Sequence, residues 1–333
     1  LKIVSSGKGI LAADESNATM TKRLDSVNVS SNPENRLKFR NILFSSKSME
    51  SCIGGVILYD ETIKQNSVSK KTIPDLISSS GAVPGIKVDK GAIPLSTDSD
   101  EKFTEGLDGL SERLKAYKIL GAEFTKWRAI INIDLTKNYP SSYCLESNAF
   151  MLARYAKTVQ DHLMVPIVEP EVIMDGNHTI EDCFKVTSLT LKKVFQQLKL
   201  HHVNLSGILL KPNMVVSGTE CKEQASAEKV AKLTVQCLNE NVPKDVPAIV
   251  FLSGGQSNEK ATLHLNEMNK LFKDLSWKLS YSYGRALQQP AISSWKGEEN
   301  NIKISQDALF KRSKLNSSAT SGTYSPNDEQ QIL

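Results

Sequence analysis

The sequence predicts an α/β protein, a single (β/α)8 TIM barrel with a mobile C-terminal tail. Three observations support this prediction: strand-like runs recur at a regular spacing, helical patterns separate most of them, and ionisable residues gather at their ends. The strand-like runs number eight and lie at 9–14, 53–59, 84–89, 124–131, 165–171, 206–211, 248–254 and 278–284. A spacing of roughly 40 residues suits strand–helix units, and eight such units close a barrel.

Each run is short and rich in apolar or β-branched residues, as strands are. In chain order the runs read GILAAD, IGGVILY, PGIKVD, FTKWRAII, VPIVEPE, SGILLK, AIVFLSG and KLSYSYG. The sixth run is apolar on both faces, as a parallel strand covered on both sides should be, and Pro212 ends its hydrogen-bonding ladder. Helices are expected between the strands, for example at 147–162, 179–200 and 227–239.

Residues 1–315 are expected to form the catalytic barrel domain, and residues 316–333 a flexible C-terminal tail. The tail segment is rich in Ser, Thr, Gly, Asn, Asp and Gln, a composition typical of mobile segments. The alternative fold is an open doubly wound sheet. That fold is less well supported, because no glycine-rich turn of the dinucleotide-binding kind follows the first strand-like run.

Composition excludes several classes of function. The formal net charge of +4 is mild and leaves no electrostatic footprint of nucleic-acid binding. The sequence contains no run of about 18 apolar residues, so no membrane span is predicted. The five cysteines are scattered, and none of the five histidines is spaced with a carboxylate as in a zinc hydrolase. We therefore expect reduced thiols, a cytoplasmic location, no metal site and no cofactor.

Polar residues fall at or near the C-terminal ends of the strand-like runs, and in a barrel these ends meet around one mouth. They are Asp14, Lys87, Lys126, Arg128, Glu169, Glu171, Lys211, Ser253, Gly284 and Arg285. Ionisable groups gathered in a cleft usually mark function. Because cations exceed anions in this set, we expect a small anionic substrate.

Lys211 is the candidate nucleophile, because it ends an apolar strand at this mouth. Desolvation among apolar walls disfavours the charged ammonium, and Lys126 is a neighbouring cation that acts in the same direction. The free amine that attacks a carbonyl then becomes accessible near neutral pH. The alternative is an ordinary surface lysine that extends its amine into water. The polar residues at the other strand ends favour the interpretation of Lys211 as a nucleophile over that of a surface lysine.

Glu169 and Glu171 are two residues apart, so both face the same side of a regular strand. They are candidates for acid–base work, although simple ion pairing with the lysines is an alternative. Ser253-Gly254-Gly255-Gln256 follows a strand and offers backbone N–H groups to an anion. Arg285 follows the next strand, and loops after the seventh and eighth strands are the usual phosphate site of this fold.

Eight motifs resemble class I fructose-bisphosphate aldolase, in the family's order. They are GKGILAADES (7–16), GIKVDKG (85–91), GLDGLSER (106–113), KWR (126–128), PIVEPE (166–171), LLKPNM (209–214), FLSGGQ (251–256) and SYGRAL (282–287). The resemblance covers most of the chain. It implies a (β/α)8 barrel, a metal-free Schiff-base mechanism and a homotetramer.

The resemblance also implies roles for individual residues. Lys211 corresponds to the Schiff-base lysine and Glu169 to the main proton-transferring carboxylate. The residues that assist them are Glu171, Lys126 and Asp14. The residues that match the C1-phosphate site are Ser253, Gly254, Gly255, Ser282, Gly284 and Arg285. Those on the C6-phosphate side are Ser16, Arg23 and Lys87, and Arg128 is a further substrate-binding candidate. The chain departs from the family in having Ser16-Asn17-Ala18-Thr19 where a Ser-Thr-Gly-Ser run is common. It also ends in Leu333, whereas the family's mobile tail ends in a tyrosine.

The implied reaction is the reversible cleavage of fructose 1,6-bisphosphate to dihydroxyacetone phosphate and glyceraldehyde 3-phosphate. One alternative is another Schiff-base barrel lyase, of the transaldolase type. Two groups of basic residues for phosphate favour a bisphosphate substrate instead. A second alternative is an adaptor that binds acidic peptides or actin filaments at the basic mouth, which mild basicity permits but no motif requires.

Overall fold

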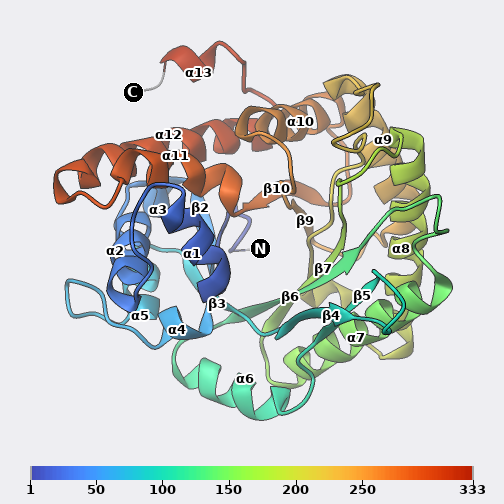
Figure 1. The fold of residues 1–333 in the computed structure, drawn as a ribbon, viewed down its shortest axis with the longest axis horizontal. Helices are drawn as coiled ribbons and strands as arrows, with labels where there is room; N and C mark the ends of the chain where they lie inside the picture. Colours follow the sequence, from blue (N-terminus) through green and yellow to red (C-terminus); the bar gives the residue numbers. More distant parts are fainter. Residues whose placement is uncertain (1, 332–333) are drawn as a thin grey trace.

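Eight parallel strands close into a barrel, in the order β1-β10-β9-β8-β7-β6-β3-β2. The computed structural model describes residues 2–331, and Figure 1 shows the helices arranged around the strands. The barrel strands are β1 (Gly9–Ala13), β2 (Ile53–Leu58), β3 (Val83–Lys87), β6 (Phe124–Ile131), β7 (Val165–Val172), β8 (Leu209–Leu210), β9 (Ala248–Phe251) and β10 (Lys278–Tyr283). The predicted (β/α)8 barrel is therefore confirmed, and each predicted run overlaps one barrel strand.

The helices fill the connections between strands and cover the outside of the barrel. They are α1 (Asn17–Asp25), α2 (Pro33–Phe44), α3 (Ser48–Ser51), α4 (Asp60–Ile63), α5 (Ile73–Ser79), α6 (Leu110–Ile119), α7 (Ser142–Asp161), α8 (Ile180–Leu200), α9 (Ala227–Asn241), α10 (Asn258–Leu271), α11 (Arg285–Trp295), α12 (Ile302–Thr320) and α13 (Asp328–Gln331), with 3-10 turns η1 (Leu205–Gly207) and η2 (Glu299–Asn301). Hydroxyl side chains cap many of them: Ser141, Thr179 and Ser226 each accept a backbone N–H of the first turn of α7, α8 and α9. Among residues 2–331, no helix is both long and apolar enough to cross a lipid bilayer.

Two features of the sheet differ from the prediction. Strand β8 is only two residues long, because η1 occupies the start of the predicted run and Pro212 cannot donate to a ladder. A hairpin of β4 (Gly91–Pro94) and β5 (Lys102–Glu105) lies outside the barrel and was not predicted. Its Thr104 hydroxyl donates to the carbonyl of Arg128, so the hairpin braces β6 near the mouth.

The barrel interior below the mouth is filled by apolar side chains. Phe124 is fully buried there, packed with residues such as Ile10, Ile167 and Val250. Gly85 on the neighbouring strand makes room for it, since a Cβ built on Gly85 would lie 2.4 Å from the Phe124 ring. A second apolar layer joins the outer face of the strands to the helices.

The C-terminal segment departs from the predicted domain boundary. The boundary at 315/316 falls inside α12, where Asn316 is fully buried and accepts a hydrogen bond from Thr262 at 2.8 Å. Further on, the Tyr324 backbone N–H donates to Asn266 at 2.9 Å, and Arg312 pairs with Glu329 at 2.5 Å. The small polar residues that resemble a mobile tail pack closely in this helix, which is why composition misplaced the boundary. Leu333 lies outside the described residues.

Replacing Phe124 by alanine should destabilise the protein by about 3–5 kcal/mol, because it leaves a cavity in the barrel interior. The measurement is the midpoint of urea unfolding followed by circular dichroism. Ile119→Ala is the control, since Ile119 is 86% exposed and its loss should cost less than about 0.5 kcal/mol. Equal midpoints for the two variants would contradict the assignment of Phe124 to the core.

Candidate active site

All fifteen residues proposed from the sequence line one cleft at the barrel mouth. The cleft has a volume of about 430 Å³. Its predicted lining residues are Asp14, Ser16, Arg23, Lys87, Lys126, Arg128, Glu169, Glu171, Lys211, Ser253, Gly254, Gly255, Ser282, Gly284 and Arg285. The structure thus brings together the carboxyl ends of seven barrel strands. This was predicted from the polar residues found at the ends of the strand-like runs.

Strand register sets the positions of the charged side chains. On the parallel pair β3–β6, Lys87 lies opposite Lys126, and on β6–β7, Arg128 lies opposite Glu169. Glu171 follows two residues later on the same face of β7 and forms an ion pair with Arg128. Both glutamates are buried and line the cleft, so the expectation that they share a face is correct.

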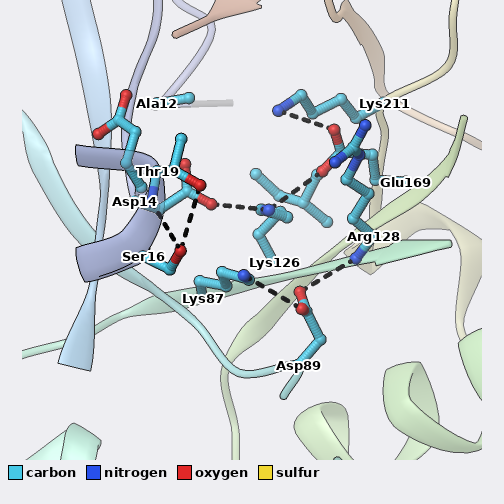
Figure 2. Close-up of polar contacts among 12 residues, drawn as sticks. Ala12, Asp14, Ser16, Thr19, Lys87, Asp89, Lys126, Arg128, Glu169 and Lys211 are labelled. Atoms are coloured by element: carbon cyan, nitrogen blue, oxygen red, sulfur yellow. Dashed lines mark hydrogen bonds and ion pairs between the residues drawn. The ribbon is translucent and has the colours of Figure 1, made fainter. Parts of the chain in front are cut away.

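Four charged groups meet at the bottom of the cleft (Figure 2). Lys211 Nζ lies 3.1 Å from Glu169 Oε1, and Lys126 Nζ lies 3.4 Å from Glu169 Oε2. Lys126 Nζ also lies 2.7 Å from Asp14 Oδ2. Both lysines are buried, so Lys211 is not a surface lysine that extends into water. Glu169 is therefore a carboxylate shared by two buried lysines.

Burial and ion pairing act in opposite directions on these groups. Burial disfavours the charged form of Asp14, but Lys126, Lys211 and Lys87 outweigh this and hold its pKa below the ordinary value. The pKa of Glu169 is lowered in the same way: desolvation opposes ionisation, and Lys211 and Lys126 more than offset it. Burial also disfavours the Lys126 ammonium, yet Asp14 and Glu169 raise its pKa. Both carboxylates are therefore ionised and Lys126 is a cation at neutral pH.

One side of the cleft is built to accept an anion. Gly254, in the loop after β9, has a φ of +56°, and the Ser282 hydroxyl on β10 is buried without a hydrogen-bond partner. Arg285 begins α11, and no side chain caps the first turn of this helix. The Arg285 guanidinium donates to the carbonyl of Gln256 at 3.0 Å, which ties the two loops together.

The other side of the cleft holds a second group of cations and hydroxyls. Ser16 caps α1, and its Oγ lies 3.2 Å from the Thr19 hydroxyl. Figure 2 shows these two side chains facing each other. Thr19 also lines the cleft, so the altered Ser-Asn-Ala-Thr run still offers two hydroxyls there. Lys87 is held by Asp89 at 3.3 Å, and Arg23 reaches in from α1.

Sequence reasoning missed the residues that hold the predicted ones in place. Glu15 is buried and pairs with Arg23 at 2.7 Å, and Asp89 pairs with Lys87 and accepts the Arg128 backbone N–H at 3.3 Å. Both lie inside motifs that the resemblance uses, next to Asp14 or Lys87, but nothing in their spacing indicates which cation each contacts. Within the described chain, no group of three or more His, Cys, Asp or Glu side chains is arranged to hold a metal ion.

Comparison with known proteins identifies the family of this chain. The family model for class I fructose-bisphosphate aldolase matches residues 1–332. A fructose-bisphosphate aldolase of Dictyostelium discoideum is 47% identical, with 97% of this chain and 90% of the relative covered. Fructose-bisphosphate aldolase 6, cytosolic, of Arabidopsis thaliana is 49% identical, with 96% of this chain and 88% of the relative covered.

A solved structure shares the fold over nearly the whole chain. It is the fructose-bisphosphate aldolase of Plasmodium falciparum in complex with TRAP and a small-molecule inhibitor, 44% identical with a TM-score of 0.95. The match covers 97% of this chain and 93% of that one. The chain therefore belongs to the class I fructose-bisphosphate aldolase family.

Proposed function

We propose that the chain cleaves fructose 1,6-bisphosphate reversibly into dihydroxyacetone phosphate and glyceraldehyde 3-phosphate, through an imine on Lys211. The observation that carries the proposal is the 3.1 Å contact between Lys211 Nζ and the buried Glu169 carboxylate, at the bottom of a cation-rich cleft. An amine beside a buried carboxylate can transfer its proton there, and only the neutral amine attacks a carbonyl.

Glu169 is the proton carrier for imine formation. It takes a proton from the Lys211 ammonium, and the neutral amine then attacks C2 of the open-chain sugar. The protonated Glu169 returns its proton to the departing hydroxyl, which leaves as water and gives the iminium. Lys126, 3.4 Å from Glu169, stabilises the carboxylate that is regenerated.

The iminium then serves as the electron sink for carbon–carbon cleavage. A base removes the proton of the C4 hydroxyl, and the electrons of the C3–C4 bond move to the iminium to form an enamine. Glu169 and Asp14 are both ionised at this stage, and either can act as the base. Glyceraldehyde 3-phosphate leaves first, and protonation and hydrolysis of the enamine release dihydroxyacetone phosphate.

Two anion-accepting regions support a bisphosphate rather than a monophosphate lyase of the transaldolase type. We assign the C1 phosphate to the loop that begins at Ser253 and to Arg285, where backbone N–H groups and a guanidinium converge. We assign the C6 phosphate to Ser16, Thr19 and Lys87 on the other side of the cleft. Orientation by both ends brings C2 to Lys211 and raises the effective concentration of the reacting groups.

A second proposed role is the binding of acidic peptides or actin filaments at the same mouth. The Arg128 side chain is 40% exposed and Arg285 is exposed, so these cations can reach a macromolecule. The solved Plasmodium falciparum relative is a complex with TRAP. A peptide in the mouth must be displaced by fructose 1,6-bisphosphate, and binding unaffected by saturating substrate would rule this role out.

We further propose a cytoplasmic location and a homotetramer. An Arabidopsis thaliana relative is named cytosolic, and the five cysteines of this chain are free thiols, as a reducing compartment favours. Exposed apolar side chains on α7, Tyr143 and Phe150, are of the kind that subunit interfaces cover. Fractionation of cells that express the tagged chain tests the location, and recovery in a membrane-bound compartment would overturn it.

Borohydride reduction in the presence of dihydroxyacetone phosphate should attach the substrate to Lys211 and inactivate the enzyme. Lys211→Arg keeps the positive charge but removes the nucleophile, so its activity should fall by several orders of magnitude. Peptide mapping by mass spectrometry locates the label. A label on Lys126 or Lys87, or an active Lys211→Arg variant, would show that the imine forms elsewhere.

Arg285→Ala should reduce kcat/KM for fructose 1,6-bisphosphate by the equivalent of about 2–4 kcal/mol, because the C1 phosphate loses a charge-assisted donor. Steady-state kinetics with the purified variant measures the change. Arg154→Ala is the matched control, since Arg154 is an exposed arginine on α7 that does not line the cleft. The same kcat/KM in both variants would remove Arg285 from the phosphate site.

Size-exclusion chromatography with light scattering should give a mass about four times the 36.7 kDa of the chain. We expect a tetramer because subunit contacts would remove exposed apolar side chains from water. A monomer mass at micromolar concentration, from a preparation that cleaves substrate, would contradict the tetramer and leave the catalytic proposal intact.

A further inference from the structure

Met174 lies over the loop Ser253–Gln256 of the cleft and accepts a hydrogen bond from one of its backbone N–H groups. The Gly255 backbone N–H donates to the Met174 thioether sulfur at 3.0 Å. Met174 follows β7, whereas Gly255 follows β9, so the contact joins loops from two different strand ends. A thioether is a weak acceptor, and a donor held by one is easily given up to an anion.

The contact is close on several sides. A Cβ built on Gly255 would lie 3.1 Å from the Met174 sulfur, and one built on Gly254 would lie 3.4 Å from it. A side chain at position 255 would crowd the thioether, whereas one at position 254 would only touch it. Met174 therefore occupies the space directly above the two glycines assigned to the C1 phosphate.

A second cavity lies behind this contact. It has a volume of about 300 Å³, and Met174 and Gly255 line both this cavity and the active-site cleft. Its walls include the apolar side chains of Val216, Ala225 and Val230. Its other walls include polar side chains such as those of Ser217, Gln224 and His264. Methionine is unbranched and has three rotatable side-chain bonds, so its thioether can turn from the cleft toward the apolar wall of this cavity.

We propose that the Met174 thioether competes with phosphate for the Gly255 amide and so weakens phosphate binding at this loop. Without phosphate, the thioether holds the donor; when phosphate binds, the side chain withdraws into the neighbouring cavity. The inference rests on the proposed function, because it takes the loop after β9 as the C1-phosphate site. Met174 thereby sets how strongly a phosphate must bind in order to displace the thioether from the Gly255 amide.

The partial exposure of Met174 also opens its thioether to oxidation. Of the seven methionines, only Met174 and Met151 are partly exposed; the other five are buried. A peroxide transfers one oxygen to the thioether sulfur and is itself reduced, hydrogen peroxide to water, which leaves methionine sulfoxide. The sulfoxide oxygen is a far stronger acceptor than the thioether, so we expect it to hold the Gly255 amide and exclude phosphate.

Met174→Leu and Met151→Leu form a matched pair for the test, because leucine keeps the volume but cannot be oxidised and accepts no hydrogen bond. The KM for fructose 1,6-bisphosphate and the Kd of inorganic phosphate are measured before and after peroxide treatment. A thiol reductant is then added to reverse oxidation of the partly exposed Cys221. Peptide mass spectrometry quantifies the sulfoxide at each methionine.

In the wild type and in Met151→Leu, oxidation should raise both constants about tenfold, and methionine sulfoxide reductase should reverse the change. In Met174→Leu, both constants should be a few-fold lower than in the wild type and insensitive to peroxide. A peroxide-sensitive Met174→Leu variant, or wild-type constants unchanged at full Met174 oxidation, overturns the inference. Failure of untreated wild type to form the Lys211 imine would instead overturn the proposed function, so the two failures are distinguishable.

Discussion

Two lysines and two carboxylates are buried together at the bottom of the barrel mouth, and the rest of the structure keeps them in contact. Lys126 contacts both Asp14 and Glu169, and Lys211 contacts Glu169. Removal of an ion from water costs several kcal/mol, so each of these groups must be paired. The four come from four different strand ends, and only a closed barrel brings those ends within ion-pair distance.

The apolar half of the barrel makes this arrangement rigid. Below the charges, the interior is filled by Phe124 and aliphatic side chains, and Gly85 leaves room for the ring. Dense packing fixes the strand register, and the register in turn sets which charged side chains are neighbours. The covalent chemistry proposed for Lys211 needs such precision, because a proton must pass repeatedly between its amine and Glu169.

Groups farther from the buried cluster are held by weaker and more adaptable contacts. Arg285 is exposed and is held by loop carbonyls, and the Gly255 amide is held by a thioether. These contacts can exchange for contacts to a phosphate at little cost, whereas the buried cluster cannot rearrange without leaving a charge unpaired. The cleft therefore combines a fixed reaction centre with an adjustable rim.

The sequence by itself determined the barrel, the approximate positions of its eight strands and fifteen of the residues that line the cleft. It could do so because parallel strands of a barrel are apolar on both faces, so each polar residue near a strand end is conspicuous. The tertiary structure alone decided which charges pair: Glu15 with Arg23, Asp89 with Lys87, and Glu169 with both lysines. It also decided that the segment after residue 315 begins as helix and that Met174 covers Gly255. These contacts join residues distant in the chain, and neither composition nor spacing encodes the distance between two side chains that meet only when the barrel closes.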